Sequence, residues 1–220
     1  NDQIKHYVQK WFVLSTLTSR YIGSPESQMD RDMRSIQEKG FLSFLADTEA
    51  SALSETFWTV TLPQNLETSS VNSPAFNVFL AAQEHLNCNS LFMNGLKVGD
   101  LITISGDIHH IFPRAYLRDK GVNSKTKYNQ VANYIYLDPQ VNKAISDAAP
   151  CEYFGRALRQ CETKELELGN ITELTLLKEN LAENCIPETV IEMDASRYDE
   201  FLIERRKLMA VMMRRYYMSL

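Results

Sequence analysis

Two short β-prone runs lie in the middle of a chain that is otherwise patterned for helices, and they constrain its fold most. The first begins at Leu101–Ile104 and continues through Asp107–Phe112 to Pro113. The second is Tyr134–Leu137, which is aromatic and β-branched. Such residues favour strands, and proline ends a strand. Two short runs separated by a long polar loop predict a small two-stranded hairpin set into a helical protein.

Helix-start signals divide the rest of the chain. Each is a capping residue followed by a proline suited to the first turn of a helix: Ser24-Pro25, Ser73-Pro74 and Asp138-Pro139. Apolar residues at helical spacing indicate a first helix over residues 1–22. The mixed, polar stretch 57–72 is predicted to be mostly loop. We therefore expect a mainly α fold.

The chain is expected to organise around its middle. Its 220 residues, 44% of them hydrophobic, suffice for one core with an appended lobe. We expect a helical lobe over residues 1–100, the hairpin and its following helix over 101–155, and C-terminal helices over 156–220 that pack on the same domain. The last helix carries four arginines off its apolar stripe: Arg205, Arg206, Arg214 and Arg215. They could touch a nucleic-acid backbone, although arginines in such positions are more often solvated or paired.

Composition narrows the class of protein. No apolar run is long enough to span a bilayer, and the first residues do not have the pattern of a signal peptide. The cysteines form no CxxC pair: Cys88, Cys151, Cys161 and Cys185. Neither a zinc ribbon nor a disulfide framework is therefore expected. These features predict a cytoplasmic protein without a membrane partner.

The net charge is −5, but basic residues gather in the long loop of the hairpin. Asp119 is the one acidic residue between His109 and Lys127, and five basic residues surround it: Arg114, Arg118, Lys120, Lys125 and Lys127. A basic stripe on an acidic protein fits a confined contact with phosphate. An ordinary solvated loop is the alternative interpretation.

Polar side chains mark the joints of the predicted strand–loop–strand–helix segment. His109 and His110 close the first strand, Asn133 opens the second, and Asn142 lies near the start of the helix. Histidine can deprotonate a water near neutral pH, and a divalent cation can neutralise charge on a phosphate. Adjacent residues on a strand point to opposite sides, so the two histidines cannot easily share one role. If the strand end is twisted, one could bind a metal while the other acts as base. Taken alone, each of these residues is more often structural, a turn residue or a surface residue, but their joint order favours phosphodiester hydrolysis.

Three segments of the chain also resemble a known pattern: His109–Pro113, Asn133–Leu137 and Asn142–Asp147. Together they resemble the HNH endonuclease, or ββα-metal, motif, and are similar in layout to the HNH domain of RNA-guided CRISPR effector nucleases. The resemblance is closer to the C-terminal nuclease domain of GmrSD-type, modification-dependent restriction proteins. It covers most of the chain and is strongest over residues 105–155. The fold class it implies is mainly α with a small central ββα-metal (HNH) motif.

The resemblance implies a role for each joint residue. His110 matches the general base that activates water. His109 and Asn142 match the metal ligands, although relatives more often have a carboxylate and a histidine there. Asn133 matches the asparagine that pins the hairpin loop and orients the base.

Three further residues are assigned roles on weaker grounds. Asp107 lies two residues before His109, on the same side of a regular strand, and could supplement the metal ligands. Arg114 and Lys143 are candidate phosphate contacts. Mg²⁺ is the expected metal, with Mn²⁺, Ni²⁺ or Zn²⁺ as alternatives, because an imidazole is a softer ligand than a carboxylate.

The implied function is metal-dependent cleavage of DNA, in phage defence by restriction of modified DNA. Members of the GmrSD-type family carry an N-terminal nucleotide-hydrolysing domain. This chain contains no phosphate-cradling GxxxxGK[ST] loop, so it is expected to be a piece of a longer protein that carries that domain. Two alternatives stay open: a non-catalytic nucleic-acid-binding or interaction module on a ββα scaffold, and an unrelated helical protein whose His109-His110 pair is structural.

Overall fold

Helices dominate the computed structural model, which describes residues 2–104 and 107–220. The described strands are β1 (His109–His110) and β2 (Tyr134–Ile135), which pair antiparallel, with His109 opposite Ile135 and His110 opposite Tyr134. The prediction of a mainly helical chain with a small two-stranded sheet in its middle is confirmed. Ser105 and Gly106, inside the predicted first β-prone run, lie outside the described residues.

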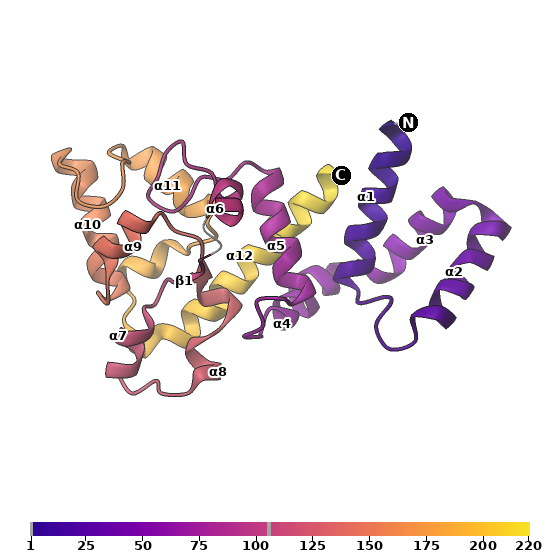
Figure 1. The fold of residues 1–220 in the computed structure, drawn as a ribbon, viewed down its shortest axis with the longest axis horizontal. Coiled ribbons are helices and arrows are strands. Elements are labelled where there is room, and N and C mark those ends of the chain that lie inside the picture. The colour runs from indigo at the N-terminus through magenta and orange to yellow at the C-terminus, as the bar shows by residue number, and fades with distance from the viewer. Residues whose placement is uncertain (1, 105–106) are drawn as a thin grey trace.

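The N-terminal part is a series of helices that reaches one end of the molecule at α1–α3 (Figure 1). The elements are α1 (Asp2–Leu17), α2 (Pro25–Lys39), α3 (Phe41–Ala52), the π-helix η1 (Phe57–Thr61), α4 (Leu62–Asn65), α5 (Pro74–His85) and α6 (Val98–Ile104). The prediction of loop over residues 57–72 is wrong for its first half. Trp58 and Leu62, four residues apart, are buried in the core, and a helical backbone places both on one face.

The predicted strand over Leu101–Ile104 is also wrong, because these residues end α6. Val98 and Leu101, three positions apart, pack into a small cluster with Cys88 and Tyr136. Tertiary packing on one helix face thus outweighs the β propensity of the isoleucines.

The segment between and after the strands contains short helices. These are α7 (Arg114–Asp119), α8 (Lys125–Tyr128), the 3-10 helix η2 (Val131–Asn133) and α9 (Pro139–Ile145). The basic segment predicted as a loop therefore contains α7 and α8. Asp138 caps α9 as predicted, because its Oδ1 accepts hydrogen bonds from the backbone N–H groups of Gln140 (2.9 Å) and Val141 (3.2 Å).

The C-terminal part ends in a long helix that crosses much of the molecule (Figure 1). The elements are α10 (Pro150–Thr163), α11 (Leu174–Glu183), η3 (Glu188–Glu192), η4 (Ala195–Arg197) and α12 (Tyr198–Ser219). α12 contacts α1, α4 and α5 as well as η2 at the hairpin. Within the described ranges, no helix combines the length and the apolar character needed to cross a bilayer.

One hydrophobic cluster extends from α1 to the C-terminus. It includes Val13 of α1, Met213 of α12 and, from the hairpin, Ile111, Phe112 and Ile135. The strands are short, but the side chains around them belong to the main core. The polar groups at the hairpin are therefore carried by a packed scaffold and not by a separate loop.

Candidate functional site

The two histidines of β1 present their side chains to opposite faces of the hairpin. His110 is paired with Tyr134, and the two rings lie nearly perpendicular with centroids 5.3 Å apart. His109 is paired with Ile135. Residues directly opposite on paired strands share a face, so Tyr134 and Ile135 mark the two different sides. The pairing therefore separates the two imidazoles, so they do not share one role.

Asn133 closes the long loop of the hairpin at its base. Its side chain is fully buried; Oδ1 accepts from the N–H of Phe112 (2.8 Å), and Nδ2 donates to the carbonyls of Phe112 and Tyr128 (3.1 Å each). It therefore ties the two ends of the loop together, as the resemblance implied. No described hydrogen bond joins Asn133 directly to His110, so any effect on the base passes through the loop.

Asn129 is the residue whose side chain hydrogen-bonds to His110. It follows α8, is half-buried, and its Oδ1 lies 2.9 Å from Nε2 of His110. Its role could not be predicted from the sequence, because nothing local distinguishes it from the other polar residues of the basic segment. The interaction spans 19 residues and depends on the return of the loop to β1.

Both histidines have a lowered pKa. Burial lowers the pKa of His110, the hydrogen bond with Asn129 partly opposes this, and nearby positive charge at Arg114 lowers it further. Burial also lowers the pKa of His109, against the opposing effect of Asp107. Neutral imidazoles have a lone pair that can take a proton or bind a metal. Both rings are therefore in the form that the predicted roles require near pH 7.

The candidate metal ligands carry donor atoms of different kinds. Asn142 is half-buried in α9, and neither its carboxamide nor the ring of His109 hydrogen-bonds to any residue that the structure describes. Asp107 is exposed near His109. Across residues 2–104 and 107–220, no group of three or more His, Cys, Asp or Glu is placed to hold a metal ion. An imidazole, an amide oxygen and one carboxylate suit a divalent cation whose remaining positions go to water and phosphate.

The basic residues predicted to contact phosphate lie on the surface. Arg114 begins α7, Lys143 lies on α9, and both are exposed. The other cations of the basic segment, which runs over residues 114–127, are exposed too: Arg118, Lys120, Lys125 and Lys127. Lys120 pairs with Asp119 at 3.2 Å. For the others, no carboxylate of the described chain forms an ion pair, so their charge is available to a ligand.

Buried side chains of α12 donate hydrogen bonds to backbone carbonyls of the hairpin. Arg205 is 1% exposed, and its guanidinium donates to the carbonyls of Ala132 and Tyr134, both at 2.8 Å. Tyr198 donates from its hydroxyl to the carbonyl of Lys127 at 3.0 Å. The prediction that Arg205 lies off the apolar stripe, accessible to nucleic acid, is therefore wrong. Arg206 is nearly buried as well.

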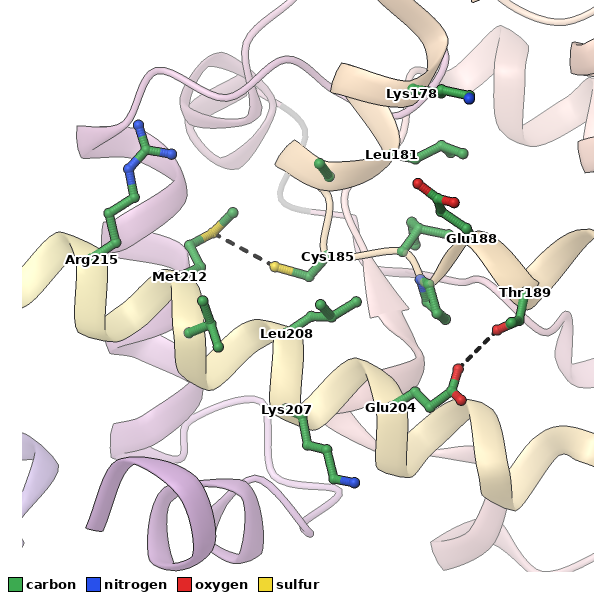
Figure 2. A pocket seen from close by; sticks show the side chains of 14 residues that line it. Lys178, Leu181, Cys185, Glu188, Thr189, Glu204, Lys207, Leu208, Met212 and Arg215 are labelled. Carbon is green, nitrogen blue, oxygen red and sulfur yellow. Dashed lines mark hydrogen bonds between the residues drawn. The ribbon is translucent and has the colours of Figure 1, made fainter. Parts of the chain in front are cut away.

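An apolar groove of about 630 Å³ lies between α11, η3 and α12 (Figure 2). Leu181, Leu208 and Met212 line it, and the Sγ of Cys185 lies 3.8 Å from the Met212 sulfur. Burial raises the pKa of the Cys185 thiol to about 12, so it remains protonated and a poor nucleophile near neutral pH. None of the predicted site residues lines this groove.

The comparisons with known proteins identify one relative without an assigned activity. No family model matches the chain, and no solved structure matches it. The chain is similar to an uncharacterized protein of Methanocaldococcus jannaschii, with 24% identity over 189 residues. The match covers 84% of this chain and 31% of the archaeal protein, so the chain spans less than a third of that relative's length.

Proposed function

We propose that this chain carries a ββα-metal (HNH-type) nuclease site that hydrolyses phosphodiester bonds in DNA. The observation that carries the proposal is the hairpin itself. It holds His109 and His110 on opposite faces, His110 hydrogen-bonds to Asn129, and Asn133 ties the loop. These neutral imidazoles beside a basic surface segment are what hydrolysis of a charged phosphate ester requires.

In the proposed mechanism, His110 takes a proton from a water that is aimed at the phosphorus atom. His109 and Asn142, supplemented by Asp107, would hold a divalent cation, with Mg²⁺ the first candidate. When bound, such an ion stabilises charge on the phosphate and on the leaving oxygen. The lowered pKa of His110 keeps the base unprotonated near neutral pH.

The proposed substrate is DNA, contacted mainly through its backbone. Arg114, Lys143 and the rest of the basic segment contribute exposed positive charge. Contacts of this kind position a nucleic acid without reading its bases. The resemblance supports two further parts of the proposal: restriction of modified phage DNA, and a partner domain in the same protein that hydrolyses nucleotides.

The first test is nicking of supercoiled plasmid and of glucosylated phage DNA in Mg²⁺, Mn²⁺ or EDTA. We expect cutting that requires metal and is lost in His110→Ala, by about 10²-fold or more, because the base is gone. His6→Ala, an exposed histidine of α1, is the matched control. If His110→Ala cuts as well as the unaltered protein, the role of His110 is wrong. Equal DNA binding in EDTA without any cutting would favour the non-catalytic module instead.

Asn142→Ala tests the metal ligand separately from the chemistry. We expect Mn²⁺ affinity, measured by titration calorimetry, to fall about tenfold or more, because one of few protein ligands is removed. His110→Ala should bind Mn²⁺ nearly as the unaltered protein does. Unchanged affinity in Asn142→Ala would remove Asn142 from the ligand set.

A further inference from the structure

We propose that Asn129 is a positioning residue that holds His110 as the Nε2–H tautomer and thereby makes Nδ1 the atom that accepts the proton. The assignment of the tautomer stands on the geometry of the hairpin. Its meaning for catalysis rests on the proposed nuclease function. Neither the sequence pattern nor the resemblance assigned a role to Asn129.

The direction of the hydrogen bond sets the tautomer. Oδ1 of Asn129 faces Nε2 of His110 at 2.9 Å. A carboxamide oxygen only accepts hydrogen bonds, so Nε2 must carry the hydrogen. A neutral imidazole has one N–H and one lone pair, which leaves the lone pair on Nδ1. The ring of Tyr134 packs nearly perpendicular to the imidazole, with the two centroids 5.3 Å apart.

Asn129 is well placed to hold a ring in position because its own backbone is anchored. Its N–H donates to the carbonyl of Lys125 at 2.9 Å, which closes α8. The carbonyl of the preceding residue, Tyr128, accepts from Asn133 Nδ2 (3.1 Å) and from the Tyr198 hydroxyl (3.3 Å). The hydrogen bonds that Asn133 and Tyr198 make with the loop thus hold Tyr128, the residue directly before Asn129. A fixed second partner is what orients a functional histidine.

The proton balance of the step is simple. Nδ1 of His110 takes a proton from water, the hydroxide forms a bond to phosphorus, and the bond from phosphorus to the leaving oxygen breaks. The ring, now an imidazolium with both nitrogens protonated, returns one proton to solvent, and the leaving oxygen takes one from solvent. Throughout, Nε2–H keeps its hydrogen bond to Asn129, so the ring does not have to reorient between turnovers.

The test reads the tautomer directly from the ¹⁵N chemical shifts of the imidazoles in the full chain without added metal, at a pH where the rings are neutral. His110→Ala assigns the His110 signals. We expect the Nε2–H form to dominate in the unaltered protein and in Asn129→Asp, which keeps an acceptor. Asn129→Ala should lose this preference, whereas Asn123→Ala, an exposed asparagine of the same loop, should keep it. An Nδ1–H form in the unaltered protein, or no change in Asn129→Ala, would overturn the proposal.

A second measurement connects the tautomer to catalysis. If the chain cleaves DNA, Asn129→Ala should lower kcat about 10- to 100-fold with little change in KM, since it disturbs a group behind the base and not a substrate contact. Asn129→Asp should restore most of the rate. The ¹⁵N spectrum shows whether Asn129 sets the tautomer of His110, even if no variant cuts DNA. Loss of the tautomer preference without any nuclease activity would contradict the proposed function and leave the assignment of Asn129 intact.

Discussion

At the scale of single residues, Asn133 shows why the hairpin loop has a defined shape. The side chain is fully buried and satisfies three backbone groups at the two ends of the loop. An apolar residue of similar size would leave those groups without partners in the core. Buried backbone groups without partners are costly, so the asparagine is required by the loop whether or not the site is catalytic.

We expect Asn133→Ala to lower the free energy of unfolding by about 2–4 kcal/mol, because a buried donor and two acceptors lose their partner. The measurement is urea unfolding followed by circular dichroism. Asn123→Ala, which is exposed, should change the free energy by about 0.5 kcal/mol or less. Equal unfolding midpoints for the two variants would show that the loop does not depend on Asn133.

At the scale of elements, α12 holds the hairpin through a buried charge. Arg205 lies in the middle of the helix and reaches the carbonyls on both sides of Asn133, at Ala132 and Tyr134. A third carbonyl, that of Asn184, lies at 3.4 Å. Burial lowers the pKa of Arg205 to about 10, which still leaves it charged near pH 7. The C-terminal helix is therefore part of the scaffold of the candidate site.

Arg205→Met keeps an unbranched side chain at this position and removes its donors. We expect a loss of about 2–4 kcal/mol in the free energy of unfolding, because buried carbonyls lose their partners. Nuclease activity, if present, should fall at temperatures where the fold is still intact. Arg215→Met on the exposed face of α12 is the control. A loss no larger than that of Arg215→Met would contradict the supporting role of Arg205.

A second link between elements joins the turn after α1 to α2. Asp32 is nearly buried and accepts hydrogen bonds from Arg20 (2.7 and 2.6 Å), Tyr21 (2.9 Å) and Gln28 (2.8 Å). Burial by itself raises the pKa of Asp32, but the hydrogen bonds from Arg20, Tyr21 and Gln28 outweigh it, and the net pKa is lowered. The carboxylate therefore stabilises the fold only while it is ionised.

This link predicts a dependence on pH. A carboxyl with a lowered folded-state pKa stabilises the fold above its unfolded value, about 3.9, and this contribution is lost as the pH falls through the folded-state pKa. Asp32→Asn should be less stable than the unaltered protein at pH 7, and the difference should shrink below about pH 4. Urea unfolding at about pH 7, 4 and 3 measures it. A difference that stays constant over this range would exclude the ionised carboxylate as its cause.

At the scale of the whole molecule, charge is distributed unevenly. The chain has a net charge of −5, yet the basic segment over residues 114–127, which contains α7 and α8, exposes five basic residues. A nucleic acid would be repelled by much of the protein and attracted to this segment, which lies beside His110 in sequence and, at Arg114, close enough to affect its pKa. Such an arrangement would direct a phosphate backbone towards the hairpin.

DNA binding should therefore depend on salt through this segment. Removal of one lysine that touches a phosphate should reduce the slope of log K against log salt by about 1 unit, so Lys125→Ala combined with Lys127→Ala should reduce it by about 2. Fluorescence anisotropy of a labelled duplex in EDTA at several salt concentrations measures the slope. Lys5→Ala, exposed on α1, should leave it unchanged. An equal effect of Lys5→Ala would mean that binding is spread over the molecule.

Local signals in the sequence were sufficient for the elements that depend on neighbours along the chain. Ser73 and Asp138 cap their helices with their own side chains, as the Ser-Pro and Asp-Pro pairs predicted. Ser24 precedes α2 at the predicted position, but its side chain makes no capping hydrogen bond. The strands at His109-His110 and Tyr134-Ile135 were predicted from β-branched and aromatic composition and the intervening loop. Turn, capping and periodicity effects act over a few residues, so one sequence is enough to recognise them.

Interactions between distant parts of the chain decided the rest. Leu101–Ile104 became the end of a helix because Leu101 and Val98, three positions apart, pack in one cluster with Tyr136. Arg205 is buried because carbonyls of the hairpin, more than 70 residues away, accept its hydrogen bonds. Asn129 meets His110 only after the loop has folded back. The sequence by itself therefore determined the helical class, the hairpin and its histidines, whereas the tertiary structure decided which polar side chains surround them, because those interactions require close packing of segments that are far apart in the chain.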